Sequence, residues 1–418
     1  MKQEIKNRIK DINNGIVPSG YEKTEIGTFP VGWKTTTLDE LLEFKNGVNA
    51  DKEKYNSGVK MISVMDILTD SPIYYDKIKG QVDIDKKTLG TYSVTYGDIL
   101  FQRSSETFED AGKSNVYLDQ DRTATYSGFV IRGKKKADYN PYFLNEALRI
   151  WQVRNQIIRN AAGSQHINVG QDSLAKIIVP LASDAEQSKI AEILMKWDKA
   201  IELQEKTIEK LHTKRDAVVQ RVIKKKEGWH KEILSNILVE RTEFATKEDG
   251  YPHASLTMDG VTQKTDRYNR DFLVKSDDKK YKVTHYNDIC YNPANLKFGV
   301  ICVNKYENNA IFSPIYITYE VNPQYNTDFI GSILCSADFI RYIRKYEEGT
   351  VYERQAVKSS DLLRGVIWVP DTKEEQDQIA SIISEINTYI QKQIDYCNSL
   401  KQQRKALQQY LLNGIVRV

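Results

Sequence analysis

Two stretches of the chain carry hydrophobic residues in the same seven-residue rhythm. In residues 184–226 and again in 373–412, apolar positions recur at alternating steps of four and three. Such spacing places them on one face of a helix and is typical of a coiled-coil seam. We therefore predict two long helices. Their central seam positions are Trp197, Ile201, Gln204, Ile208, Leu211 and Arg215 in the first and Ile386, Ile390, Gln393, Cys397, Leu400 and Arg404 in the second.

The two seams are copies of one another. Each seam position of the second helix follows its counterpart by 189 residues. Even the polar exceptions match, Gln204 with Gln393 and Arg215 with Arg404. A heptad pattern alone usually indicates only a buried helix face. A pattern preserved together with its exceptions indicates an internal duplication.

The polar seam residues also predict how the helices pair. Parallel pairing would set Arg215 against Arg404, and two like charges in a desolvated seam are unfavourable. In an antiparallel pair, one register brings Gln204 to Arg404 and Gln393 to Arg215, and polar layers of this kind fix a register. The competing register, one heptad away, sets Gln204 against Cys397. We predict the first of these two registers.

Outside the helices, the chain repeats a skeleton of short strands. Tyr96-Gly97-Asp98-Ile99 matches Tyr286-Asn287-Asp288-Ile289, and Ser127-Gly128-Phe129 matches Ser313-Pro314-Ile315. β-rich runs between turn residues predict strands around these positions. The loops between the matching positions differ in sequence. One skeleton with two sets of loops suggests one binding task carried out on two targets.

The ends of the chain resemble one another, since Asn14-Gly15-Ile16-Val17 recurs as Asn413-Gly414-Ile415-Val416. We infer a near-circular arrangement whose termini lie close together. The predicted class is α+β, with two β-rich domains joined by two long antiparallel coiled-coil helices in an internal pseudo-twofold duplication. The expected segments are an N-terminal segment completing the circular repeat (1–30), a first domain (31–182), a central helix (183–227), a second domain (228–371) and a C-terminal helix (372–418).

Composition adds few constraints. The 418 residues are 40% hydrophobic and 28% charged, with a net charge of +3, which is ordinary for a globular protein. The four cysteines and five histidines show no disulfide or metal-ligand spacing. No apolar run reaches the ~18 residues needed to span a bilayer. We expect reduced thiols, no metal site, no membrane contact and a cytoplasmic location.

Two motifs suggest catalysis but lack its essential parts. Asn292-Pro293-Ala294-Asn295 is similar to the Asn-Pro-Pro-aromatic motif of amino-methyltransferases, but the second proline and the aromatic residue are missing. Gly112-Lys113-Ser114 is similar to a phosphate-binding loop, but Thr107 occupies the place of its first glycine. A glycine-rich methyl-donor loop is absent from the sequence. We therefore expect no catalytic residue in this chain.

Several short motifs follow one another in a recognisable order. They are Pro30-Val31-Gly32-Trp33, Gly97-Asp98-Ile99-Leu100-Phe101, Gly163-Ser164-Gln165, Val179-Pro180 with Glu186-Gln187, and the ending from Gln402 to Gly414. Repeated twice in this order, they resemble the specificity subunit of type I restriction-modification systems over nearly the whole chain. The second copy departs from the pattern, with Asn287 for a glycine and Thr350-Val351 for Ser164-Gln165. This departure concerns only the details of its loops.

The resemblance implies a division of labour in defence against foreign DNA. Each globular domain would be a target-recognition domain that reads one half of a bipartite, asymmetric site in double-stranded DNA. The helices would set the spacing and dock two modification (methyltransferase) subunits, which would carry the methyl donor. Motor-nuclease subunits would join the full complex. The chain itself would be non-catalytic and would hold no cofactor.

The candidate DNA contacts are polar residues in loops of the β-rich domains, where a scaffold can present them. Arg can pair with guanine, Asn or Gln with adenine, and Lys mostly contacts phosphates. The candidates in the first domain are Lys45, Asn46, Asn49, Lys52, Lys54, Arg103, Ser105, Lys113, Gln165, His166 and Asn168. Those in the second domain are Gln263, Lys264, Arg267, Asn295, Lys297, Arg354 and Gln355.

Two other functions stay open at this point. One is a self-contained methyltransferase or nuclease, against which the incomplete motifs count. A binding assay with labelled methyl donor would identify it. The other is a coiled-coil scaffold with two protein-binding domains. A gel shift with random DNA at low and high salt would separate this scaffold from a DNA-binding protein, because phosphate contacts make affinity salt-dependent.

Overall fold

In the computed structural model, the chain forms two compact units. Unit 1 comprises residues 1–205 with 396–418, and unit 2 comprises residues 206–395. The structure describes residues 3–163, 166–257, 260–263, 280–347 and 356–418. Both units combine helices with short strands, so the predicted α+β class is confirmed. Over these described ranges, no helix is both long enough and apolar enough to cross a bilayer.

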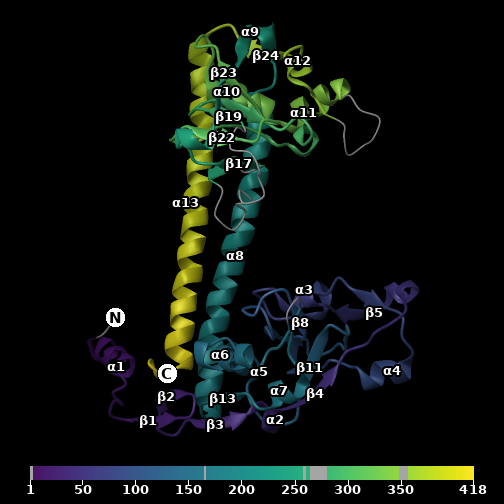
Figure 1. Cartoon of the computed structure of the whole chain (residues 1–418), viewed down its shortest axis with the longest axis vertical. Helices are drawn as coiled ribbons and strands as arrows, with labels where there is room; N and C mark the ends of the chain where they lie inside the picture. Colours follow the sequence, from purple (N-terminus) through teal and green to yellow (C-terminus); the bar gives the residue numbers. More distant parts are fainter. Residues whose placement is uncertain (1–2, 164–165, 258–259, 264–279, 348–355) are drawn as a thin grey trace. The chain divides into compact units, whose positions relative to one another are not determined.

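Unit 1 is built on an antiparallel sheet of four strands (Figure 1). Their order is β4 (Leu42–Asn46), β11 (Val130–Lys135), β7 (Ile99–Gln102) and β9 (Ser114–Val116). Successive side chains of a strand point to opposite faces of the sheet. In β7, Ile99 and Phe101 therefore enter the main core of the unit, whereas Leu100 enters a smaller core on the other face. β7 therefore contributes to both cores.

The other elements of unit 1 are short and surround this sheet. A three-stranded sheet contains β10 (Thr125–Tyr126), β5 (Tyr55–Ile62) and β6 (Gln81–Val82). Two-stranded pairs join β1 (Tyr21–Thr24) with β2 (Gly27–Pro30), β3 (Lys34–Thr37) with β13 (Ile178–Leu181), and β8 (Ser104–Ser105) with β12 (Ile167–Asn168). The helices are α1 (Gln3–Asn13), α2 (Leu38–Leu41), α3 (Val64–Ile67), α4 (Lys86–Thr91), α5 (Pro141–Ala147), α6 (Trp151–Arg159) and α7 (Gln171–Ala175).

Unit 2 repeats the central sheet of unit 1. Its strand order is β15 (Leu238–Glu240), β23 (Ile317–Val321), β20 (Ile289–Tyr291) and β21 (Ile301–Val303). The other strands are β16 (Phe244–Ala245), β19 (Tyr281–Thr284) and β22 (Ala310–Phe312) in one sheet, and the pairs β17 (Ala254–Thr257) with β18 (Gly260–Gln263) and β14 (Trp229–Ile233) with β24 (Val366–Pro370). The short helices are α9 (Leu234–Ile237), α10 (Thr327–Leu334), α11 (Ala337–Ile343) and α12 (Ser359–Leu362).

Equivalent hydrogen bonds confirm the duplication predicted from the sequence. The indole of Trp33 donates to Glu186 at 2.8 Å, and the indole of Trp229 donates to Glu375 at 3.1 Å. Before the central strand of each sheet the backbone is left-handed, with φ of 91° at Gly97. The matching Asn287 has φ of 68°. Asparagine is one of the few non-glycine residues that adopt this conformation readily. Asn287 can therefore replace the glycine of the first copy without changing the fold.

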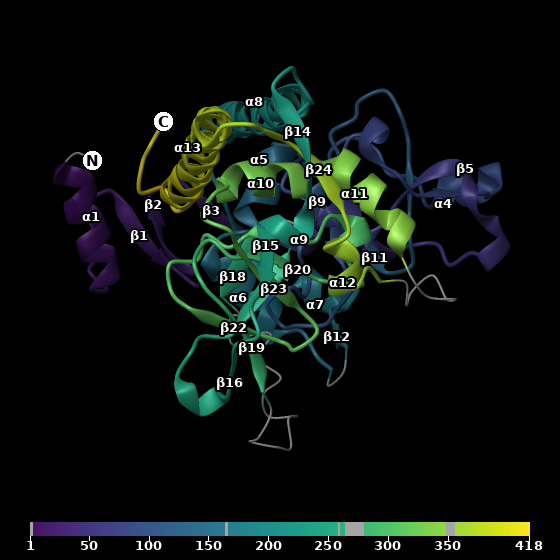
Figure 2. The same ribbon diagram turned by 90° about the horizontal axis from the view of Figure 1, so that it is seen from above.

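The two long helices are α8 (Asp184–Val222) and α13 (Lys373–Leu412). Their predicted seam positions are all buried or half-buried. Within unit 1, Glu205 pairs with Lys401 at 2.6 Å and Asp198 pairs with Arg404 at 2.8 Å. Rising numbers on one helix therefore meet falling numbers on the other, and the two lie side by side (Figures 1 and 2). Antiparallel pairing is confirmed for this part of the helices.

The predicted polar layer between Gln204 and Arg404 is wrong. The guanidinium of Arg404 bonds to Asp198, which neighbours Trp197 on α8. In the competing register Arg404 faces Trp197, so the observed pair favours that register. The physical reason is that a carboxylate accepts a stronger, charge-assisted bond from a guanidinium than a neutral amide does. In unit 2, Arg215 likewise donates to a carboxylate, that of Asp216, at 2.6 Å.

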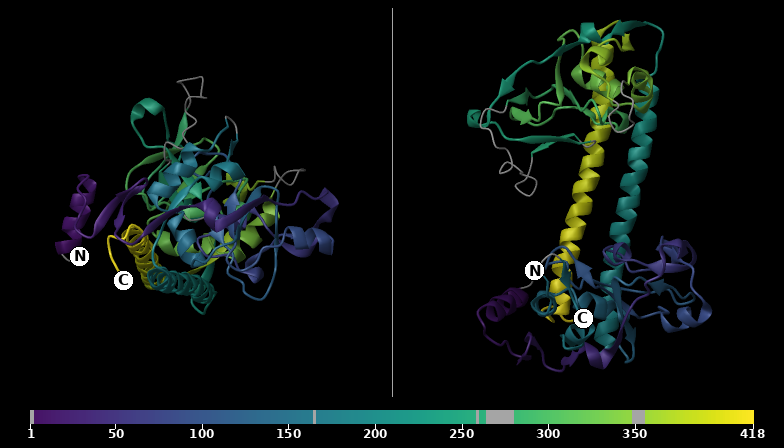
Figure 3. Two further views of the ribbon diagram at one scale, coloured as in Figure 1. Left: turned by 90° about the horizontal axis from the view of Figure 1, so that it is seen from below. Right: turned by 45° about the vertical axis from the view of Figure 1, so that its right-hand side comes forward.

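The two ends of the chain contact each other within unit 1, as predicted. The guanidinium of Arg8 donates to the carbonyl of Ile415, and the hydroxyl of Tyr21 donates to that of Gly414 at 2.5 Å. Gly414 has φ of 64°, and a Cβ there would lie 2.3 Å from the ring of Pro30. Only glycine fits this close approach. Both views in Figure 3 show α1 beside the end of α13.

Candidate nucleic-acid interface

Loops that are far apart in the sequence come together at one end of the central sheet of unit 1, where its strands stop. We call this end of the sheet the first edge. Strands β4 and β7 end at this edge, and β11 begins there, because β11 runs antiparallel to both. Backbone hydrogen bonds tie the loops together. Val48 donates to Tyr126 at 2.9 Å, Arg103 to Phe129 at 3.0 Å, and Val169 to Arg103 at 3.0 Å. Loops fixed in this way can present side chains in a defined arrangement.

Three of the predicted contacts meet in a depression at this edge. Asn46, Arg103 and Asn168 line a hollow of about 440 Å³ together with residues 169–172. Arg103 is half-buried and donates to the carbonyl of Gly128 at 3.3 Å. The Asn168 amide oxygen accepts from Ser104 at 2.5 Å, and its nitrogen donates to His166 at 3.0 Å. The hollow thus offers a cation and two amides, which are groups that pair with base edges.

The remaining candidates of unit 1 have varied surroundings. Ser105 is buried and its hydroxyl donates to the carbonyl of Thr107 at 2.7 Å, so it holds the loop in place. Lys113 pairs with Asp110 at 2.6 Å. Lys45 lies over the ring of Tyr92 at 4.8 Å. Lys52 and Lys54 are exposed in a 3₁₀ turn, and Asn49 and His166 are exposed loop residues. Gln165 lies outside the described residues.

In unit 2, the segment that follows β20 lies at the equivalent end of the central sheet, which we call the second edge. Asn292 is buried and its side chain accepts from the backbone of Ala294 at 3.1 Å. This local bond gives Asn292 a structural role in the motif that is similar to a methyltransferase site. Asn295 is exposed, and the Lys297 ammonium lies 5.2 Å from the centre of the Phe298 ring. Among the candidates elsewhere, Gln263 is exposed, whereas Lys264, Arg267, Arg354 and Gln355 lie outside the described residues.

Sequence reasoning missed two apolar residues at these edges. Phe129 and Ile315 precede strands β11 and β23, and both side chains are exposed. Phe129 was expected to belong to a β-rich run, in which a large apolar residue would be assigned to the core. The signal that could have found them is their matching position in the two copies.

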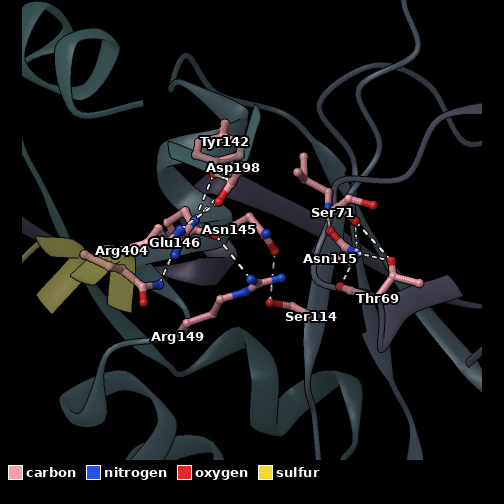
Figure 4. A network of polar contacts seen from close by, with 12 residues as sticks. Thr69, Ser71, Ser114, Asn115, Tyr142, Asn145, Glu146, Arg149, Asp198 and Arg404 are labelled. Atoms are coloured by element: carbon pink, nitrogen blue, oxygen red, sulfur yellow. Dashed lines mark hydrogen bonds and ion pairs between the residues drawn. The ribbon is translucent and has the colours of Figure 1, made fainter. Parts of the chain in front are cut away.

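A buried network of charges joins α5 to both long helices within unit 1 (Figure 4). Arg404 pairs with Glu146 at 2.7 Å and with Asp198 at 2.8 Å, and Tyr142 donates to Asp198. Gln408 adds a hydrogen bond to Glu146 at 2.8 Å. Burial alone would lower the pKa of Arg404, but the neighbouring carboxylates hold that pKa above its usual range. The network thus keeps Arg404 charged and anchors α13 to the first domain.

Acidic, histidine and cysteine side chains do not gather into a metal-binding group in the described part of the chain. No three of them lie close enough there to hold a metal ion. The four cysteines are free thiols, and burial raises the pKa of Cys290 well above its usual value. A thiol with a raised pKa is a poor nucleophile at neutral pH.

Comparisons with known proteins agree on one family. The sequence-family model described as the type I restriction modification DNA specificity domain matches residues 30–213 of this chain. A putative type I restriction enzyme MjaX specificity subunit from Methanocaldococcus jannaschii is 28% identical over 235 residues, which are 55% of this chain. The match covers 52% of that protein, so the chain spans about half the length of its curated relative.

One solved structure shows a similar fold. This similar chain has a TM-score of 0.59 and 12% sequence identity to the present chain. Its structure is described as the structural basis underlying complex assembly and conformational transition of the type I R-M system. The match covers 93% of the present chain and 99% of that chain. The S subunit of a type I system from M. genitalium matches with a TM-score of 0.47 and 15% identity, over 91% of the present chain and 96% of that chain. At such identities the first of these matches supports the fold alone.

Proposed function

We propose that this chain is a type I restriction-modification specificity subunit, as its match to the specificity-domain model and to a curated relative supports, and that it reads DNA and performs no catalysis itself. Each unit reads one half of a bipartite, asymmetric site. The observation that carries this proposal is the same sheet edge in two copies with different side chains. Asn46, Arg103 and Asn168 meet at the first edge, whereas the loop at the second presents Asn295 and Lys297.

We further propose that α8 and α13 set the distance between the half-sites and dock two modification subunits. The methyl donor binds to those subunits, and motor-nuclease subunits join them for cleavage of double-stranded DNA. The proposed location is the cytoplasm, where the free thiols of this chain stay reduced.

Two measurements test the proposal. Methylome sequencing of cells that express the chain with its modification subunits should reveal one motif with two different halves. A continuous motif, or no motif, argues against the proposal. The chain purified alone should not bind labelled methyl donor, and stoichiometric binding would favour a self-contained methyltransferase.

A further inference from the structure

The turn before the second strand of the central sheet carries an exposed apolar residue in both units. In unit 1, Val130 closes this turn by donating to Ser127 at 2.9 Å, and in unit 2 Tyr316 donates to Ser313 at 3.1 Å. The third residue of each turn is Phe129 or Ile315, and these side chains are 65% and 61% exposed. Single exposed apolar residues are common on protein surfaces. Their recurrence at one position of a duplicated skeleton calls for a shared cause.

Phe129 lies among the polar groups of the first edge. The backbone of Arg103 donates to the carbonyl of Phe129 at 3.0 Å, and its guanidinium donates to that of Gly128 at 3.3 Å. Asn49 packs against the same turn, because a Cβ on Gly128 would lie 1.8 Å from its amide oxygen. The turn is therefore held on both sides by residues that can pair with bases. These bonds fix the backbone that carries the exposed ring.

Ile315 occupies the corresponding place in unit 2. It precedes Ile317, which pairs with Tyr291 at the end of β20. The segment after Tyr291 leads to the exposed Asn295. Because antiparallel neighbours end and begin at one edge of a sheet, Ile315 and this segment share that edge.

We propose that Phe129 and Ile315 are specificity-determining residues, each contacting the 5-methyl group of a thymine in the major groove of its own half-site. The inference rests on the proposed function and deepens it. In the major groove, the base edges offer hydrogen-bond donors and acceptors and one apolar group, the thymine methyl. An apolar side chain fixed among hydrogen-bonding residues matches that pattern. Each unit thus reads one base pair by apolar contact beside its polar contacts.

The test uses the full chain in complex with its modification subunits and the motif that the wild-type complex methylates. Each thymine of a half-site is replaced in turn by deoxyuridine, which lacks only the methyl group, and affinity is measured by gel shift. One replacement in the first half-site should weaken wild-type binding about 5-fold, near the lower end of the cost of a mismatched base pair. The Phe129→Ala variant should bind the thymine and deoxyuridine duplexes equally. Ile315→Ala should behave in the same way toward the second half-site.

Matched controls separate this effect from general loss of exposed apolar surface. Trp151 and Val239 are 66% and 62% exposed and lie in α6 and β15. Trp151→Ala and Val239→Ala should keep the full response to deoxyuridine at both half-sites. The Phe129→Ala variant should keep its response at the second half-site, which also shows that it has folded.

The inference is overturned if no deoxyuridine duplex binds the wild-type complex more weakly than its thymine parent. It is also overturned if Phe129→Ala and Ile315→Ala remain as sensitive as wild type. A wild-type complex that methylates no bipartite motif refutes the proposed function itself. A clear motif without a deoxyuridine effect refutes the thymine contact alone.

Discussion

At the scale of single residues, Arg404 and Arg215 show how a duplicated position acquires two environments. Arg404 pairs with Glu146 and Asp198, and Glu146 is almost fully buried. The residue 189 positions after Asp198 is Asn387, so the second copy lacks this carboxylate. Arg215 donates instead to Asp216, whose side chain is exposed. Among the residues that the structure describes, the shared arginine therefore belongs to a buried charge network in the first copy and to an exposed ion pair in the second.

This difference predicts unequal costs for the same substitution. Arg404→Met removes the closest cation from the buried Glu146, which keeps Arg149 at 3.3 Å, and should lower the free energy of unfolding by about 3 kcal/mol. Arg215→Met breaks an exposed pair and should cost under about 1 kcal/mol. Urea unfolding, read by hydrogen exchange in α5 and in the last turns of α13, measures both. Equal losses for the two variants would contradict the network's role.

At the scale of elements, the helix pair was predictable in its direction but not in its register. Heptad spacing fixes which face of each helix is apolar, and the matched seams predicted antiparallel pairing correctly. The register depends on what the polar seam residues meet. Arg404 meets Glu146 from α5, a helix of the first domain. Reasoning about the two helices alone could not include this partner.

The same limit applies to the candidate interface. The sequence predicted Asn46, Arg103 and Asn168, and the strand ends bring them together. It also proposed Ser105, which the fold buries, and it named neither Phe129 nor Ile315, which the fold exposes. Hydrophobic periodicity identifies strands, but at their ends it does not show whether a side chain turns inward or outward.

A cross-link tests the register directly. In the register favoured by the Asp198–Arg404 pair, residue 204 faces Cys397, whose pKa is raised by burial and by nearby Glu205. Gln204→Cys should therefore cross-link to Cys397 with a short thiol reagent, and the reaction should need a pH above the ordinary thiol pKa of about 8.5. Peptide mass spectrometry detects the product. The Cys397→Ser variant is the control, and efficient linking of Gln204→Cys to Arg404→Cys in that background would restore the rejected register.

At the scale of the whole molecule, each unit is completed by both long helices. The core of unit 1 contains Ile190 from the start of α8 and Leu411 from the end of α13. The core of unit 2 contains Ile383 from the start of α13, with Val222 from the end of α8 packed against it. A change in helix length should therefore leave both cores intact.

This arrangement predicts that the length of the two helices sets the distance between the half-sites. If both units enter the major groove from one side, the half-sites should lie about one turn, roughly 10 bp, apart. Inserting one heptad after Gln204 and another beside Cys397 preserves the seam and adds about 10 Å, or roughly three base pairs at 3.4 Å each. The methylated motif should keep both halves and gain a longer gap. An unchanged gap with full methylation would show that the helices do not set this distance.

If the two units recognise their half-sites independently, exchanging one of them should change one half of the methylated motif. Residues 34–178 are replaced by the same segment of a relative that methylates a different motif, and the methylome of cells expressing the hybrid is sequenced. One half of the motif should change to that of the relative, while the other half should stay as in the wild type. A change in both halves, or in neither, would contradict independent recognition.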